Sequence, residues 1–201
     1  KTLYRLHPME ILIDERTASG EPLGAMFLDL YKEGKFALMN PPEAILLQNK
    51  SFMALVYALA RTEQFLTPAE CALVERCLVP SYFEDDFAAL MDGTYIRKEI
   101  WGREGKNVRL VEKQGGHTET VHEKNPDNAD DIICRESCAA MYQDFIRQPR
   151  FTHTVDSGSI EGCLTLSCFM LFDTPSAVGA RFSPAAIAGT EAYFLPLVTA
   201  E

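Results

Sequence analysis

The clearest pattern in the chain is a set of apolar residues at helical spacing. In the first third of the sequence such residues occupy positions i, i+3, i+4 and i+7, as Leu23, Met26, Phe27 and Leu30. Gly34 follows where this helix would end, because glycine tolerates the left-handed backbone that closes many helices. Residues 43–60 are rich in helix formers, and the polar residues 49–51 interrupt them, so the pattern predicts a helix capped by Ser51.

A third helix has a specific start signal. Thr67, Pro68 and Glu70 match a capping box with proline in the first turn, and we expect a helix to about Leu78. The opening of the chain also carries apolar residues at near-helical spacing, namely Tyr4, Leu6, Met9, Leu12 and Ile13. No polar leader precedes them, so we expect that something comes before Lys1.

Strand-like runs dominate the rest of the sequence. Segments rich in β-branched and aromatic residues occur at Phe36–Met39, Thr94–Ile100, Val108–Glu112, Ala139–Phe145, Leu164–Phe172 and Ala177–Phe182. We expect the first to be short and buried, and the second and third to form a hairpin with GREGKN at a flexible tip. Residues 115–131 are polar and rich in Gly, Asn and Asp, which predicts a mobile connection.

Composition and charge narrow the possible partners. Hydrophobic residues make up 47% and charged residues 24%, as in ordinary globular proteins. The formal net charge of −10 argues against a nucleic-acid or anionic-membrane partner, because both require clustered Lys and Arg. No apolar run approaches the roughly 20 residues that span a bilayer, so we expect a soluble, cytoplasmic protein. Six cysteines without a CxxC pair and four histidines without a metal or nucleophile motif predict no metal site.

The hairpin tip carries the most informative chemistry. A lysine that projects from a strand, such as Lys98, can meet phosphate oxygens. Gly102 and Gly105 would let backbone N–H groups approach the same anion without a Cβ in the way. Taken alone, two glycines at a hairpin tip are more often turn chemistry than a phosphate site. Neither the P-loop pattern nor GxGxxG is present.

Several segments together resemble one family. RKEIWGREGKNVRLVE is similar to the KPxxGREGxNVxxVE hairpin of bacterial glutathionylspermidine synthase-like proteins, which are permuted ATP-grasp enzymes. LYRLHPMEILIDE resembles the family's YRxYPxEWL segment, and NPPEAILLQNKSFMALVYAL resembles EPxxxxLxxNKALLxLLW. MYQDFIRQPRF, PSAVGARFS and the FLPLV ending resemble YQQFxxLPKF, PAGIGIRED and RFxPHxV in the same order. The resemblance therefore spans nearly the whole chain.

The resemblance implies an α+β, ATP-grasp fold with two lobes of mainly antiparallel sheets and flanking helices. Residues 1–201 would be the C-terminal ATP-grasp region, with residues 1–93 as a mostly helical lobe. Residues 94–201 would supply the nucleotide-binding strands and the Gly-rich flap. The family's magnesium carboxylates, and most residues that bind its peptide substrate, belong to a segment before Lys1, so we expect an incomplete fragment that is inactive alone.

The resemblance also implies roles for individual residues. Lys98 matches the lysine that contacts the α and β phosphates, and Lys50 matches a second ATP-binding lysine. Gly102, Arg103, Glu104 and Gly105 match a mobile flap over the terminal phosphates. Arg181 matches a catalytic arginine beside the transferred phosphate.

A further match concerns the adenine base. Gln143, Asp144 and Phe145 match the linker whose backbone edge reads adenine, with Phe145 as an apolar contact. Read without the family, the same three residues would be a strand end.

Two departures from the family pattern affect this interpretation. Glu99 replaces a proline after the lysine, although neighbouring strand residues point to opposite faces and Glu99 should face away from Lys98. Phe182 and Ser183 follow Arg181, where the family continues into an acidic residue.

The implied function is an ATP- and Mg²⁺-dependent ligase that joins a carboxylate and an amine through an acyl phosphate. Its substrates would be glutathione or another peptide and a polyamine such as spermidine. The alternative hypothesis is a non-catalytic nucleotide-binding or scaffold module with an ATP-grasp shape.

Overall fold

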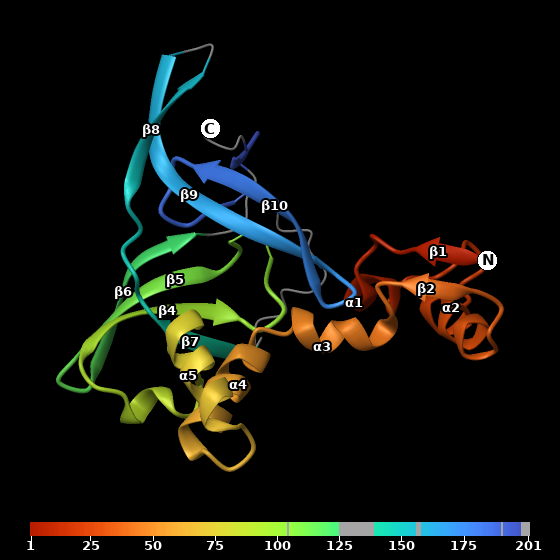
Figure 1. Cartoon of the computed structure of the whole chain (residues 1–201), viewed down its shortest axis with the longest axis horizontal. Helices are drawn as coiled ribbons and strands as arrows, with labels where there is room; N and C mark the ends of the chain where they lie inside the picture. Colours follow the sequence, from red (N-terminus) through yellow and green to blue (C-terminus); the bar gives the residue numbers. More distant parts are fainter. Residues whose placement is uncertain (104, 125–138, 156–157, 190, 198–201) are drawn as a thin grey trace.

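Three β-sheets and a few helices make up the part of the chain that the computed structural model describes, namely residues 1–103, 105–124, 139–155, 158–189 and 191–197. The two larger sheets have five and four strands, are antiparallel throughout, and lie one above the other in Figure 1. The N-terminal segment, in red and orange, stands to one side of them. The fold is thus a mixed α/β arrangement, as predicted.

The N-terminal unit combines a small parallel sheet with two helices. Its elements are β1 (Thr2–Tyr4), α1 (Met9–Leu12), α2 (Leu23–Lys32) and β2 (Ala37–Met39). The predicted helix at residues 23–30 is confirmed, and Gly34 follows it with a φ of 70°. A Cβ on Gly24 would lie 2.4 Å from the carbonyl oxygen of Leu12, so α2 packs on α1 at a distance that only glycine allows.

Two expectations for this unit are wrong. The opening residues form β1 as well as α1, because Thr2–Tyr4 pairs with β2 instead of continuing a helix. β2 was expected to be buried, but Ala37 and Met39 are exposed, since the sheet has only two strands.

Short helices connect this unit to the large sheets. They are η1 (Pro42–Ala44), α3 (Ile45–Gln48), α4 (Ser51–Thr62) and α5 (Pro68–Cys77). The capping box of α5 is confirmed, because the Thr67 side chain accepts from the Glu70 N–H and Glu70 accepts from the Thr67 N–H. At α4 the predicted cap is off by one residue. Lys50 is the N-cap, and the Asn49 side chain accepts from the Ser51 N–H at 2.9 Å.

The five-stranded sheet has the order β3-β7-β4-β5-β6. Its strands are β3 (Ser81–Phe83), β4 (Gly93–Glu99), β5 (Val108–Gln114), β6 (His117–Lys124) and β7 (Ala140–Asp144). The predicted hairpin of β4 and β5 is confirmed. The mobile connection predicted from residue 115 is wrong up to residue 124, because Gly115 and Gly116 form a tight turn with positive φ and β6 pairs with β5. Residues 125–131 lie outside the described residues.

The four-stranded sheet has the order β11-β10-β9-β8. Its strands are β8 (Arg150–Val155), β9 (Gly158–Leu171), β10 (Thr174–Ser183) and β11 (Tyr193–Leu195). The strands predicted at residues 164–172 and 177–182 are confirmed as parts of β9 and β10. Residues 145–149 lead from β7 in one sheet to β8 in the other, and therefore link the two sheets.

An aromatic core covers one face of the five-stranded sheet. Phe87, from η2 (Phe87–Ala89), stacks on Tyr142 with ring centroids 3.7 Å apart and meets Tyr95 edge to face at 5.4 Å. Lys113, only 7% exposed, donates all three of its N–H groups to the carbonyls of Phe87, Ala88 and Leu90 at 2.6–2.8 Å. The core and this lysine fix the loop that contains η2 against the sheet.

None of the helices among the described residues has both the length and the apolar character that a membrane crossing requires.

The buried lysine gives a test of the fold. Lys113→Met keeps most of the side-chain volume but leaves three carbonyls without a donor, so we expect the free energy of unfolding to fall by about 2–4 kcal/mol. Urea denaturation measures the change. Lys35→Met, at an exposed lysine, serves as the control, and a Lys113→Met loss no larger than the control's would contradict this role.

Candidate functional site

A cavity of about 560 Å³ lies between the two large sheets. Its walls come from the start of α4, from β4, β5 and β7, from the linker after β7, from β8 and β9, and from the loop after β10. The lining residues are Lys50, Val79, Ile96, Lys98, Gly105, Val108, Leu110, Gln143, Asp144, Phe145, Ile146, Arg147, Gln148, Arg150, Cys163, Ala186, Ile187 and Ala188. Residues far apart in the sequence therefore surround one volume.

Strand alternation decides which side chains of the five-stranded sheet reach this cavity. Ile96 pairs with both Leu110 and Gln143, so these three side chains share a face, and Lys98 lies two residues further along the same face. Tyr95, which precedes Ile96 in the strand, points into the aromatic core on the other face. One strand thus supplies the cavity and the core at alternate positions.

Lys98 is held near the end of β4 by a chain of hydrogen bonds. Its Nζ donates to Gln143 Oε1 at 2.5 Å, and Gln143 Nε2 donates to Ser81 Oγ at 2.8 Å. Ser81 Oγ in turn donates to the carbonyl of Val79 at 2.8 Å. Burial lowers the pKa of the Lys98 ammonium below its ordinary value, and the charge of Lys50 lowers it further.

Lys50 enters the same cavity from the start of α4. Its backbone N–H donates to the carbonyl of Ile100 at 2.9 Å, and its Nζ donates to the carbonyl of Gly102. Burial lowers the pKa of Lys50, the negative charge of Glu99 opposes this shift, and Arg103 reinforces it. Two ammonium groups therefore share a cavity in which each is poorly solvated, and that arrangement favours an anionic ligand.

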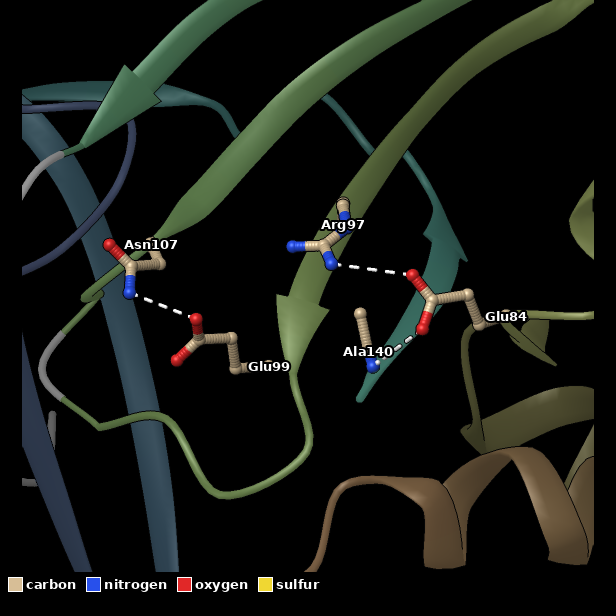
Figure 2. Close-up of polar contacts among 5 residues, drawn as sticks. All are labelled: Glu84, Arg97, Glu99, Asn107 and Ala140. Carbon is tan, nitrogen blue, oxygen red and sulfur yellow. Dashed lines mark hydrogen bonds and ion pairs between the residues drawn. The ribbon is translucent and has the colours of Figure 1, made fainter. Parts of the chain in front are cut away.

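The carboxylate of Glu99 lies on the other face of β4, as alternation predicts. Glu99 is 9% exposed and accepts a hydrogen bond from Asn107 Nδ2 at 2.9 Å, as Figure 2 shows. In the same view Glu84 accepts from Arg97 Nη2 at 3.3 Å and from the Ala140 N–H at 3.0 Å. Glu84 therefore joins β4 to the start of β7, and Glu99 braces the hairpin tip instead of facing Lys98.

The glycine-bearing tip contacts the loop after β10. Gly105 has a φ of +73°, and a Cβ there would lie 2.4 Å from the carbonyl oxygen of Ala188. Arg103 reaches away from the cavity lining, with Nη2 3.5 Å from Glu10 Oε1 in α1. Gly102 contributes its carbonyl to Lys50, and Glu104 lies outside the described residues. Of the four predicted flap residues, only Gly105 lines the cavity among those described.

The segment at residues 143–145 lines the cavity, but its backbone donors are already used. The Asp144 N–H donates to the Pro80 carbonyl at 3.0 Å, and the Phe145 N–H donates to the Thr94 carbonyl at 3.1 Å. Gln143 lies on a central strand, with β3 on one side and β4 on the other. The N–H groups of Asp144 and Phe145 are therefore engaged within the fold, and the adenine contact implied at residues 143–145 stays a prediction.

Arg181 does not line the cavity. It lies on β10, exposed, and pairs with Thr165 and Phe194. Thr165 is two residues from Cys163, which lines the cavity, so Arg181 shares the face of the sheet that borders the cavity and lies about 7 Å further along it. The structure brings Lys50 and Lys98 together in the cavity and leaves Arg181 outside its lining.

No individual role was predicted for several of the lining residues. Arg150 and Cys163 come from paired positions of β8 and β9, and β8 itself was not predicted. Arg147 and Gln148 belong to the linker, where no local pattern marks them. Arg150 also meets Glu161, with Nε 3.4 Å from Oε2. These residues reach the cavity only through the pairing of the two sheets.

The described residues contain no group of three or more His, Cys, Asp or Glu side chains that could hold a metal ion. The sequence model of the family described as glutathionylspermidine synthase preATP-grasp matches residues 1–200. A comparison with curated proteins found no match.

The lowered lysine pKa values predict how anion binding depends on pH. Sulfate keeps a constant charge from about pH 7 to about pH 10, so its affinity should fall as pH rises and the lysines lose their protons. Because each pKa lies below the ordinary 10.5, the fall should begin below that value. Binding is measured by calorimetry. The Lys50→Met/Lys98→Met variant should lose this dependence, and an identical profile in that variant would refute the assignment.

Proposed function

Because the chain belongs to the family of the glutathionylspermidine synthase preATP-grasp domain, we propose that its cavity binds ATP for an ATP-dependent carboxylate–amine ligase. The same proposal takes glutathione or another peptide as the carboxylate donor and a polyamine such as spermidine as the amine. The protein would act in the cytoplasm.

The observation that carries this proposal is the meeting of Lys50 and Lys98 in one cavity. Burial disfavours the protonated form of both amines, and each ammonium would gain stabilisation from a phosphate group. The only side-chain acceptor that meets Lys98 among the described residues is the neutral amide of Gln143. A polyphosphate would supply the missing negative charge.

The rest of the cavity suits a nucleoside. Its walls include the apolar side chains of Ile96, Val108, Leu110, Phe145 and Ile187, which can enclose the faces of a purine base. Its volume of about 560 Å³ lies within the range of about 300–1,000 Å³ typical of small-molecule sites. We assign the base to the apolar wall near Phe145 and the phosphates to the lysines.

In the proposed reaction ATP phosphorylates the carboxylate, and the amine then displaces inorganic phosphate from the acyl phosphate and loses a proton to give the amide. Lys50 and Lys98 would neutralise phosphate charge during this transfer. Gly105 at the hairpin tip, which packs on the loop at Ala188, would help to exclude water from the reactive acyl group. Mg²⁺, when bound, would add positive charge at the phosphates, and no residue that the structure describes is assigned as its ligand.

Arg181 completes the proposed set as a catalytic residue. Its guanidinium is a permanent planar cation with several donors, and it borders the cavity on the face that carries Cys163. To reach the transferred phosphate, this side chain would have to move toward the lysines, because it lies outside the cavity lining. Phosphate transfer would require this movement, whereas nucleotide binding alone would not.

A non-catalytic nucleotide-binding module is the alternative function. Two observations favour it. Arg181 does not line the cavity, and Phe182, at the position where the resemblance implies an acidic residue, is 1% exposed in the sheet. In that case ATP would bind without release of phosphate. Steady phosphate release in the presence of a peptide and a polyamine would exclude this alternative.

The nucleotide proposal is tested first at Lys98. Lys98→Met removes a charge-assisted hydrogen bond worth about 1.5–3 kcal/mol, so ATP affinity should fall by about tenfold to a hundredfold. Calorimetry on the full chain measures it. Lys35→Met changes the net charge equally at an exposed site and should leave the affinity within about twofold. Equal affinities in the two variants would remove Lys98 from the site.

Arg181 calls for a different measurement, because its proposed role is limited to the transfer step. Arg181→Met should lower kcat for ATP-dependent amide formation by about a hundredfold or more, with little change in ATP affinity. The assay follows phosphate release with glutathione and spermidine. A rate equal to that of the unaltered protein would show that Arg181 takes no part in catalysis.

A further inference from the structure

A second cavity, of about 680 Å³, lies on the opposite face of the five-stranded sheet. Lys98 and Gln143 point to the first cavity, whereas Tyr82 and Tyr95 point to the second. α4, β3 and the loop that follows η2 form its other walls. Its lining residues are Ala54, Tyr57, Ala58, Arg61, Ser81, Tyr82, Phe83, Asp86, Ala89, Leu90, Met91, Tyr95 and Asp144.

Tyrosine rings form a corner in this cavity. Tyr57 and Tyr82 stand at 84° to each other with centroids 5.8 Å apart, and Tyr82 and Tyr95 stand at 78° and 6.4 Å. Perpendicular rings turn two π faces toward one volume, and the negative potential of those faces attracts cations. Tyr57 and Tyr82 are only partly buried, so their faces are accessible from the cavity.

The charged groups that line the cavity also favour a cation. Asp86 and Asp144 contribute two carboxylates, and Arg61 contributes one cation, which leaves a single negative charge. Burial raises the pKa of Asp144, and the hydrogen bond from Tyr82 only partly opposes this shift. Burial and the charge of Asp144 also raise the pKa of Tyr82. A cation in the cavity would stabilise the Asp144 carboxylate, whereas an anion would be repelled.

The rim is held in place before any ligand arrives. Lys113 fixes the carbonyls of Phe87, Ala88 and Leu90, and the Tyr95 hydroxyl donates to the Met91 carbonyl at 2.8 Å. Asp92 accepts from the Gly115 N–H at 2.9 Å. The loop therefore needs little ordering when a ligand binds, which favours affinity.

From these features we propose that the second cavity binds an alkylammonium ion, with its charged head against the tyrosine corner and the two aspartates and its carbon chain against Ala54, Ala58 and Leu90. The bound ion is not the amine that reacts, because the cavity opens on the face of the sheet opposite the phosphate-binding lysines. Asp144 lines both cavities. Ser81, which also lines the second cavity, accepts a hydrogen bond from Gln143 of the first cavity, so the two cavities meet at both residues.

Calorimetric titration of the full chain with n-butylammonium chloride, at fixed ionic strength and without nucleotide, tests the proposal. Saturable binding is expected, whereas 1-butanol, which has the same carbon chain and no charge, should show none over the same concentrations. Asp86→Asn and Tyr57→Leu should each weaken butylammonium binding by about fivefold.

Asp85→Asn is the matched control, because Asp85 is the exposed neighbour of Asp86 and does not line the cavity. It should leave the affinity within about twofold. Absence of saturable binding, equal binding of 1-butanol, or equal effects of Asp85→Asn and Asp86→Asn would overturn the proposal. ATP affinity, measured separately, should be unchanged in Tyr57→Leu. If the unaltered protein bound butylammonium but not ATP, that result would contradict the nucleotide proposal and leave this one standing.

Discussion

The structure depends on the burial of two ammonium groups in one cavity. Lys50 and Lys98 are both drawn out of water and repel one another, which is unfavourable for the folded chain by itself. The surrounding fold must offset this cost, through the core that backs the sheet and the hydrogen bonds that run from Lys98 through Gln143 and Ser81. A site that is strained when empty gains most from the ligand that relieves it.

The two-residue period of β4 makes this arrangement possible. Tyr95 and Glu99 serve the core and the hairpin tip on one face, while Ile96 and Lys98 serve the cavity on the other. A shift of β4 by one residue would turn Ile96 and Lys98 toward the core and Tyr95 and Glu99 toward the cavity. The contacts of Glu84 with Arg97 and the Ala140 N–H fix that register at the end where both lysines meet.

How much could be predicted from the sequence varied with how local the signal was. The capping box at Thr67 and the β4–β5 hairpin were predicted correctly, because each depends on residues that are close together in the sequence. β6 was missed because its many polar residues suggest a loop, and only pairing with β5 makes it a strand. Nothing in the residue spacing joins Lys50 to Lys98, which were associated through a family resemblance. Arg150 and Cys163 could not be foreseen, because only the pairing of β8 with β9 and the approach of the two sheets bring them to the cavity.

The residue at position 105 determines how closely the two sides of the cavity approach each other. A Cβ there would lie 2.4 Å from the carbonyl oxygen of Ala188, so any side chain would push the hairpin tip and that loop apart. The distance between the hairpin tip and the loop at Ala188 therefore depends on the absence of a Cβ at position 105. A larger residue at position 105 would therefore widen the cavity and change which ligands fit it, without any change at Lys50 or Lys98.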